Sequence, residues 1–245
     1  MGDLKAFEGN LVLLGGGNMG RAMLEGWLKG GLQPSQVVVV DPAPNAQLQE
    51  LSARTGFSIL SNIAEYDDEA AVCLVVAVKP QIAEQALSSV DHVLSAKSFV
   101  LSVAAGITIS FFEHLCAPAS VIRTIPISPA LIGKGATGAF AGAGVSKSQV
   151  ELADTRLRSV GEVAWVDEEQ DIDAITALSG SGPAYVFHMV EAMAAAGEKL
   201  GLKPDVAAKL ARATVQGAGA MLEAVPEEPS TLRQNVTSPG GTTAA

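Results

Sequence analysis

The sequence predicts an α/β protein in which a doubly wound sheet is followed by a smaller all-helical domain. Apolar runs of strand length alternate with helical segments over the first two-thirds of the chain. Several runs are apolar throughout, as is typical of parallel strands that helices cover on both faces. From Asp167 to Ala224 no convincing strand remains, and long alanine-rich helical segments take over. We therefore expect a sheet domain over residues 1–167 and a helical domain over residues 168–245.

The strands are expected where short apolar runs end at turn-forming residues. The first run, Leu11–Leu14, leads directly into glycine, and the third leads into Lys79-Pro80. The full set of expected strands is 11–14, 37–41, 71–78, 98–104, 120–125 and 162–166. Helical segments lie between them, among them 80–90 and 110–115.

In the later part of the chain, proline marks where helices begin. Pro183 suits the first turn of a helix, because the N–H group that proline lacks has no partner there in any case. A second helix is expected from Pro204 to Ala224, and a short one after Ser230.

Composition and charge exclude several classes of partner. The 245 residues are 48% hydrophobic, which is ample for a core, and the formal net charge is −10. Because nucleic acids and anionic membranes require a basic face, we expect neither as a partner. No apolar run reaches the length of a membrane span, and the first residues lack the plan of a signal peptide. A cytoplasmic location is the expectation.

The cysteines and histidines indicate no metal site. Cys73 and Cys116 lie far apart in sequence, and His92, His114 and His188 share no metal-ligand spacing. We expect both thiols to be reduced. The chain also lacks an obvious general acid or base, which favours hydride transfer to an already activated acceptor over chemistry that depends on proton transfer.

A glycine-rich turn between the first strand and a helix carries the clearest chemical signal. Gly-Gly-Gly-Asn-Met-Gly at 15–20 has the G-x-G-x-x-G spacing of a dinucleotide-binding turn. Gly15 permits the tight turn, Gly17 lets the backbone approach a pyrophosphate, and Gly20 lets the helix pack against the strand. The helix amino terminus adds unpaired N–H groups. The turn predicts a Rossmann-like domain with a dinucleotide cofactor; a glycine turn without a ligand is the alternative.

Two polar residues follow expected strands. Asp41 closes the second strand, where an acid bonds the ribose 2′-hydroxyl and favours NAD, although the loop after it can still bend around a 2′-phosphate. Lys79 is positioned to bond the nicotinamide-side ribose or to attract an anionic substrate. The alternatives are an ordinary aspartate before a turn and a solvated lysine.

Two loops rich in small and hydroxyl-bearing residues, 179–183 and 238–243, are expected at helix starts. Exposed N–H groups at such starts bind carboxylates, although helix capping alone explains each loop equally well. Two such loops beside a dinucleotide domain predict a small anionic substrate.

Together these motifs resemble those of the pyrroline-5-carboxylate reductase family. Ordered along nearly the whole chain, they are Gly-Gly-Gly-Asn-Met-Gly at 15–20, Ala-Val-Lys-Pro at 77–80, Ser-Val-Ala-Ala-Gly at 102–106, Ser-Gly-Ser-Gly-Pro-Ala-Tyr at 179–185 and Asn-Val-Thr-Ser-Pro-Gly-Gly-Thr-Thr at 235–243. The last two are far more specific than the glycine turn. The resemblance implies reduction of 1-pyrroline-5-carboxylate to proline with NADPH or NADH, the final step of proline biosynthesis. It also implies a homodimer or a higher homo-oligomer that forms through the helical domain.

The resemblance implies a role for each matching residue. The residues implied around the cofactor, with Asp41 added from the strand-end argument, are Gly15, Gly17, Asn18, Met19, Gly20, Asp41, Ala77, Lys79 and Pro80. Those implied to hold or support the substrate carboxylate are Ser238, Gly241, Thr242, Asn235 and Ser181. Thr243 is the implied catalytic residue, with its hydroxyl near the ring nitrogen.

Two departures from the family accompany the resemblance. Ile127 stands where the family usually has asparagine, which removes a polar contact near the cofactor. The family also continues beyond the paired threonines, so we expect this chain to be incomplete at its carboxyl end; a natural short terminus is the alternative. The alternatives are a related reductase of another imine or of a hydroxy acid, and a dinucleotide-binding regulatory protein without turnover.

Overall fold

The computed structural model describes residues 8–238, 240 and 241. The chain forms two compact units, Met1–Pro183 and Ala184–Ala245, and each is described by itself. The domain boundary expected near residue 167 stays a prediction.

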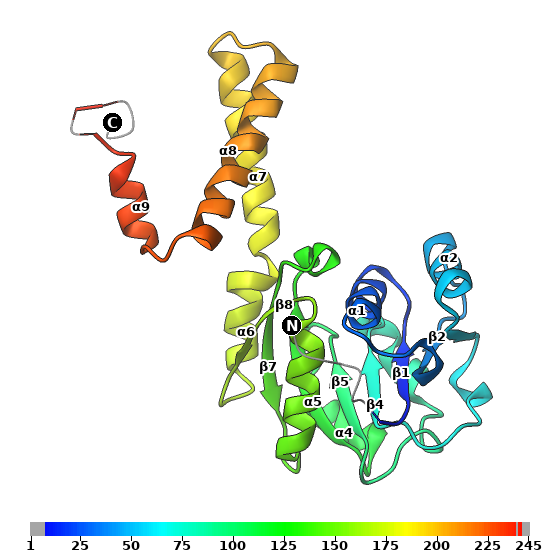
Figure 1. The fold of residues 1–245 in the computed structure, drawn as a ribbon. Helices are drawn as coiled ribbons and strands as arrows, with labels where there is room; N and C mark the ends of the chain where they lie inside the picture. Colours follow the sequence, from blue (N-terminus) through cyan, green and yellow to red (C-terminus); the bar gives the residue numbers. More distant parts are fainter. Residues whose placement is uncertain (1–7, 239, 242–245) are drawn as a thin grey trace. The chain divides into compact units, whose positions relative to one another are not determined.

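Unit 1 is built on an eight-stranded sheet with the order β3-β2-β1-β4-β5-β6-β7-β8 (Figure 1). The strands are β1 Leu11–Leu14, β2 Val37–Val40, β3 Ser58–Leu60, β4 Cys73–Val76, β5 Phe99–Ser102, β6 Ser120–Pro126, β7 Gly135–Ala141 and β8 Gly161–Trp165. Neighbouring strands from β3 to β6 are parallel, β7 is antiparallel to β6, and β8 is parallel to β7. The order reverses between β1 and β4, and ligands of such sheets bind at the carboxyl ends of the strands on either side of that reversal.

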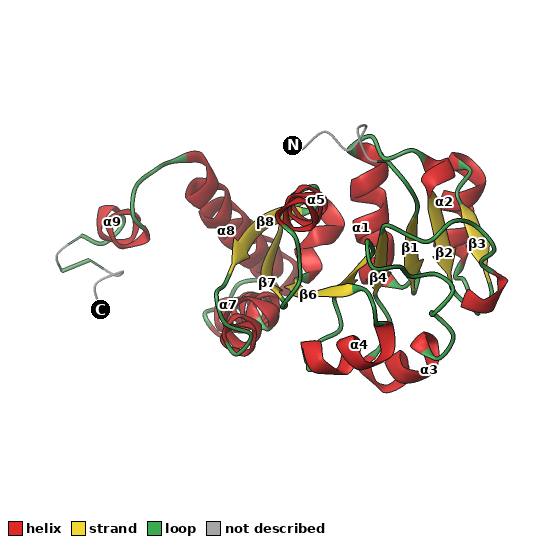
Figure 2. Cartoon of the chain, turned by 90° about the horizontal axis from the view of Figure 1, so that it is seen from below, coloured by secondary structure: helices red, strands yellow, loops and turns green. Residues whose placement is uncertain are grey.

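Helices cover both faces of this sheet (Figure 2). They are α1 Asn18–Lys29, α2 Ala46–Thr55, α3 Ala83–Leu87, α4 Ile109–Cys116, α5 Lys147–Arg158 and α6 Asp171–Ile175. One core cluster joins α1, α2 and α5 to the sheet through Trp27, Leu48 and Leu157. The other joins α3 and α4 to the opposite face through Leu87 and Phe112. The prediction of a doubly wound sheet is confirmed.

Each of the six expected strands is present, with ends that differ by up to two residues. The expected strand 71–78 is shorter, Cys73–Val76, and the expected helix 80–90 is a 3₁₀ turn, Pro80–Ile82, followed by α3. The sequence reasoning missed β3 and β7. Several apolar runs favoured parallel strands, whereas the β6–β7 pair is antiparallel.

Unit 2 consists of helices: α7 Gly182–Lys199, which begins in unit 1, α8 Pro204–Ala224 and α9 Pro229–Asn235. The two helices expected from Pro183 and Pro204 are confirmed to within one residue at each start, and the short helix expected after Ser230 begins at Pro229. Gly197 allows α7 and α8 to approach, because a Cβ atom there would lie 3.1 Å from that of Ala207. None of the helices in the described residues combines the length and apolar content that a membrane crossing needs.

Candidate functional site

The glycine turn holds the end of β1 against two neighbouring strands. Gly15 donates its N–H to the carbonyl of Val40 at 2.9 Å, and Ala77 donates its own to the carbonyl of Leu14 at 2.8 Å. Gly15 has φ +96°, and a Cβ atom there would lie 2.7 Å from the carbonyl oxygen of Ala77. The left-handed conformation and the crowding by backbone both require glycine at this position.

The other two glycines of the motif have opposite surroundings. A Cβ atom on Gly20 would lie 2.1 Å from the carbonyl oxygen of Gly15, so α1 packs against the turn at a distance that only glycine allows. Gly17 is exposed, and a Cβ atom there would meet nothing within 4 Å. Gly17 also caps α1 without a side-chain hydrogen bond, which leaves the first N–H groups of the helix for a ligand. The open space at Gly17 and the unpaired N–H groups of α1 fit a pyrophosphate that lies close to the backbone.

Asp41 lies beside this turn. Its Oδ2 accepts a hydrogen bond from the Gly16 N–H at 2.9 Å, and its Oδ1 accepts one from the Ala43 N–H at 2.9 Å. The side chain is half-buried. The register of β1 and β2, which pairs Leu14 with Val40, brings the acid to the glycine turn although the two segments are far apart in sequence.

The remaining residues predicted to bind a cofactor follow the neighbouring strand β4. Ala77 is half-buried against Gly15 and Gly20, while Lys79 and Pro80 are exposed at the start of the 3₁₀ turn. At the front of α1, Asn18 is exposed and Met19 packs partly against the core. The structure therefore gathers the predicted cofactor residues along one edge of the sheet. Ile127, which follows β6 at the same edge, begins the 3₁₀ turn Ser128–Ile132.

Sequence reasoning assigned no role to Arg123, which lies in the middle of strand β6 among mostly apolar residues. Only 4% of Arg123 is exposed, and its guanidinium donates to Glu169 Oε1 at 2.9 Å and to Asp173 Oδ1 at 3.0 Å. Glu169 Oε1 also accepts from the Ile109 N–H at 2.8 Å. These bonds tie α6 to the sheet. A charged residue inside an apolar run was the signal available in the sequence.

The segment expected as a substrate-binding loop at 179–183 has a different structure. Thr176–Gly180 forms a π-helical turn, and Ser181 donates its N–H to the carbonyl of Thr176 at 2.9 Å. Ser179 also donates its hydroxyl to the carbonyl of Ile175 at 3.1 Å. A helix does start within 179–183, since α7 begins at Gly182, but helical hydrogen bonds from α6 run into the preceding residues as far as Ser181. The role of this segment in substrate binding stays a prediction. π-helical turns do occur frequently at functional sites.

The π-helical turn lies at a place in the fold that suits a binding site, even though its own hydrogen bonds are those of a helix. A Cβ atom on Gly180 would lie 3.9 Å from the Ile125 side chain, close to the carboxyl end of β6. Ser181, which is half-buried, therefore lies at the same edge of unit 1 as the glycine turn.

The second expected loop lies only partly within the described residues. Asn235 ends α9 and is exposed, as is Ser238, whose carbonyl accepts the Gly241 N–H at 2.9 Å. Gly240 has φ +72°, a left-handed conformation that suits glycine. Thr242 and Thr243 lie outside the described residues.

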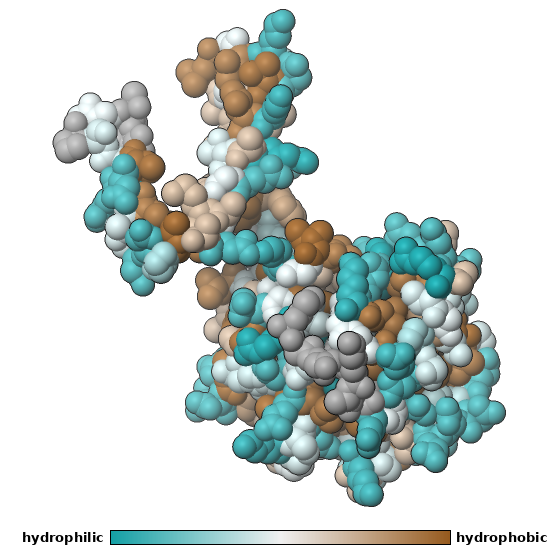
Figure 3. Space-filling view, in the orientation of Figure 1, coloured by the Kyte–Doolittle hydropathy of each residue, from teal (hydrophilic) through white to brown (hydrophobic). Residues whose placement is uncertain are grey.

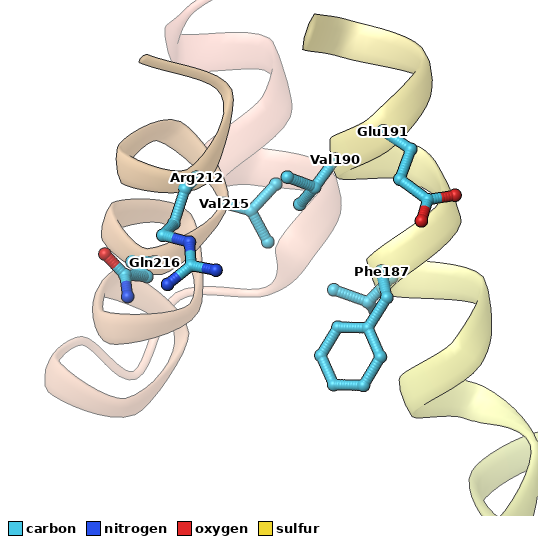
Figure 4. Close-up of a pocket in the computed structure, with 7 residues that line it drawn as sticks. Phe187, Val190, Glu191, Arg212, Val215 and Gln216 are labelled. Atoms are coloured by element: carbon cyan, nitrogen blue, oxygen red, sulfur yellow. The ribbon is translucent and has the colours of Figure 1, made fainter. Parts of the chain in front are cut away.

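The helices of unit 2 expose many large apolar side chains. Phe187 is 62% exposed, and apolar surface accompanies hydrophilic residues on these helices in Figure 3. A groove of about 440 Å³ lies between α7 and α8 (Figure 4). It is lined by Val186, Phe187, Val190, Glu191, Arg212, Val215 and Gln216. Exposed apolar surface of this extent marks an interaction site.

The two cysteines do not provide a reactive thiol for the candidate site. Both are buried and free, and burial raises the pKa of Cys73 and of Cys116 to about 12. Thiols with such pKa values stay protonated at neutral pH and are poor nucleophiles. In the described residues, no three His, Cys, Asp or Glu side chains gather as a metal site requires.

Two family models match the chain. The model described as "Pyrroline-5-carboxylate reductase dimerisation" matches residues 169–245, and "NADP oxidoreductase coenzyme F420-dependent" matches residues 10–106.

Relatives match over almost the whole chain. Pyrroline-5-carboxylate reductase of Pseudomonas aeruginosa is 38% identical over 96% of this chain and 86% of its own length. A solved pyrroline-5-carboxylate reductase from Coxiella burnetii has a TM-score of 0.88 at 36% identity, covering 96% of this chain and 87% of that one. A solved pyrroline carboxylate reductase from Plasmodium falciparum, with NADP bound, has a TM-score of 0.80 at 26% identity, covering 96% and 86%.

Proposed function

The chain belongs to the pyrroline-5-carboxylate reductase family, and from this premise we propose that it reduces 1-pyrroline-5-carboxylate to proline with NADH or NADPH. The match of residues 169–245 to the reductase dimerisation model carries the choice of reaction. The glycine turn, which leaves Gly17 open and the first N–H groups of α1 uncapped beside Asp41, supports the dinucleotide cofactor. The reaction is the last step of proline biosynthesis.

The residues of unit 1 act by binding and orientation. The open backbone at Gly17, with Asn18 and Met19 after it, receives the pyrophosphate, while Gly15 and Gly20 keep the turn tight. Asp41 accepts hydrogen bonds from a ribose. Ala77, Lys79 and Pro80 line the nicotinamide side, and the Lys79 ammonium attracts the substrate carboxylate. The reduced nicotinamide supplies a hydride when bound.

The residues near the carboxyl end of the chain hold the substrate in this proposal. Ser238, Gly241 and Thr242 bind the carboxylate of the cyclic imine, supported by Asn235 and Ser181. The hydroxyl of Thr243 forms a hydrogen bond at the ring nitrogen. Protonation of that nitrogen makes the imine carbon electrophilic, so the C=N bond gains a hydride at carbon and retains its proton at nitrogen. Orientation is then the main contribution of the protein.

Assembly through the helices is part of the same proposal. The dimerisation model matches residues 169–245, and the apolar side chains exposed on α7 and α8 support a homodimer or a higher homo-oligomer. The partners are thus a second copy of the chain and a small-molecule substrate. The absence of nucleic-acid partners and the cytoplasmic location stay predictions.

The test follows oxidation of the reduced cofactor in the presence of 1-pyrroline-5-carboxylate. Thr243→Ala should lower kcat about 10- to 100-fold, which corresponds to the loss of one hydrogen bond to a charged group. Dinucleotide affinity should not change, and Thr243→Ser should restore most of the rate because it keeps the hydroxyl. Thr231→Ala, on the exposed face of α9, is the matched control. An unimpaired Thr243→Ala variant would show that the assigned role is wrong.

A further inference from the structure

The structure fixes an acidic side chain where the adenosine end of a dinucleotide approaches the sheet. Asp41 directly follows β2, and its carboxylate accepts the N–H of Gly16 at 2.9 Å, inside the glycine turn. The same carboxylate accepts the N–H of Ala43 at 2.9 Å. Two backbone N–H groups, one to each carboxylate oxygen, thus hold the side chain in one place.

The carboxylate keeps capacity for further hydrogen bonds. An ionised carboxylate has about four acceptor positions, and these two backbone bonds use one position on each oxygen. Asp41 is only half-buried, so a ligand can reach it. A ribose with two free hydroxyls offers donors that match these acceptors. A 2′-phosphate offers only acceptors and negative charge.

The loop after Asp41 supplies no cation to offset that charge. Residues 42–47, Pro-Ala-Pro-Asn-Ala-Gln, contain neither lysine nor arginine. The next basic residue is Arg54, in the last turn of α2, about 12 Å along the helix from its first residue. On the other side of the turn, Arg21 is paired with Glu25 at 2.6 Å.

The loop is also held in its conformation. Asn45 accepts the Leu48 N–H at 2.9 Å and caps α2, and Gln49 Nε2 donates to the carbonyl of Pro44 at 3.0 Å. Pro42 and Pro44 restrict the backbone further. Leu48 fills the space over Gly16, where a Cβ atom would lie 2.1 Å from Leu48 Cδ2. Bending this loop around a 2′-phosphate would therefore break bonds that are already formed.

From these observations we infer that Asp41 makes this protein bind NADH in preference to NADPH. The inference rests on the proposed function, because it concerns the cofactor of that reaction. Like charges a few ångströms apart near a protein surface repel enough to separate the two dissociation constants about tenfold or more. Asp41 is thereby the specificity-determining residue of the cofactor site.

The test measures equilibrium binding of NADH and NADPH to the full chain by titration, without substrate. The unmodified protein should bind NADH about tenfold or more tightly. Asp41→Asn keeps the shape of the side chain and removes its charge, so the ratio of the NADPH to the NADH dissociation constant should move towards one. Asp41→Ser combined with Ala43→Arg adds a cation at an exposed position, and the preference should reverse. Thermal unfolding of each variant shows whether it remains folded.

Asp67→Asn is the matched control. It removes one charge at an exposed position. Its neighbour Tyr66 accepts a hydrogen bond from Asn10 at 3.2 Å, and Asn10 precedes β1, so this region lies at the end of the strands opposite the glycine turn. In this variant the ratio of the NADPH to the NADH dissociation constant should stay as in the unmodified protein. Equal or tighter binding of NADPH to the unmodified protein, or a ratio that a folded Asp41→Asn variant leaves unchanged, would overturn the inference and leave the proposed function intact. Binding of neither dinucleotide would overturn both.

Discussion

At the scale of single residues, the buried cation Arg123 shows what the apolar sheet tolerates. Its charge is offset by two carboxylates at 2.9 and 3.0 Å, so an arginine with 4% exposure remains compatible with a core strand. Glu169, which precedes α6, also accepts a hydrogen bond from Ile109, so its side chain connects the start of α4 to Arg123 of β6.

Replacing Arg123 with methionine should destabilise the protein by about 1–3 kcal/mol, since hydrogen bonds to charged groups are lost while the stem is kept. Urea unfolding measures the change. The control is Arg158→Met, which removes an ion pair to Asp154 at the surface, where the Arg158 side chain is 44% exposed. This variant should lower the free energy of unfolding by less than about 1 kcal/mol. Equal losses in the two variants would contradict the structural role of Arg123.

Residue type and spacing could predict that the glycines and Asp41 lie together at the carboxyl ends of β1 and β2, but they could not predict the partners of Arg123. The cofactor roles of the glycines and Asp41 stay predictions. Glu169 and Asp173, in contrast, lie 46 and 50 residues from Arg123 and meet it only because α6 packs beside β6. Long-range pairs of this kind depend on the folded topology.

At the scale of elements, the start of α1 separates two uses of glycine. Gly20 is required by packing, because backbone lies 2.1 Å from its would-be Cβ atom, whereas Gly17 faces open space. The sequence motif predicts both positions but does not distinguish their energetic roles.

Gly20→Ala should therefore destabilise unit 1 by about 1–3 kcal/mol, the usual cost of forcing an extra carbon into a packed interior. Gly17→Ala should change stability by no more than about 1 kcal/mol and should weaken NADH binding, because the added methyl group occupies the space intended for the pyrophosphate. Chemical unfolding and NADH titration of both variants check this. The reverse pattern, with Gly17→Ala the less stable, would contradict it.

The elements that sequence reasoning missed have weak local signals. Strand β7, Gly-Ala-Thr-Gly-Ala-Phe-Ala, consists mostly of glycine and alanine, which have poor strand preference, and tertiary contacts decide its structure. Gly138 in this strand makes room for Ile175 of α6, whose side chain would lie 2.6 Å from a Cβ atom there. The π-helical turn was missed for a related reason: Ser179–Gly182 has the composition of a loop, but hydrogen bonds from α6 continue through it.

At the scale of the whole molecule, the exposed apolar surface of unit 2 predicts self-association. Side chains such as Phe187, Leu210 and Leu222, exposed by 62, 53 and 56%, would be costly to leave in water over so large an area. The amphipathic pattern of α7 and α8 could be predicted from sequence, but which apolar side chains stay exposed among the described residues appears only once the helices are packed.

Light scattering should find the protein as a dimer or a larger homo-oligomer, and Phe187→Glu should shift it towards the monomer by placing a charge in the groove between α7 and α8. Ile132→Glu, at a 78% exposed position in unit 1, serves as control and should leave the assembly unchanged. A monomer at micromolar concentration in the unmodified protein would contradict the assembly.

The central claim is that this chain reduces a cyclic imine carrying a carboxylate. The most direct measurement adds 1-pyrroline-5-carboxylate to the protein with NADH, and separately with NADPH, and follows both cofactor oxidation and proline formation. We predict that one proline forms for each cofactor molecule oxidised. A protein that binds the dinucleotide but forms no proline with either cofactor would contradict the claim.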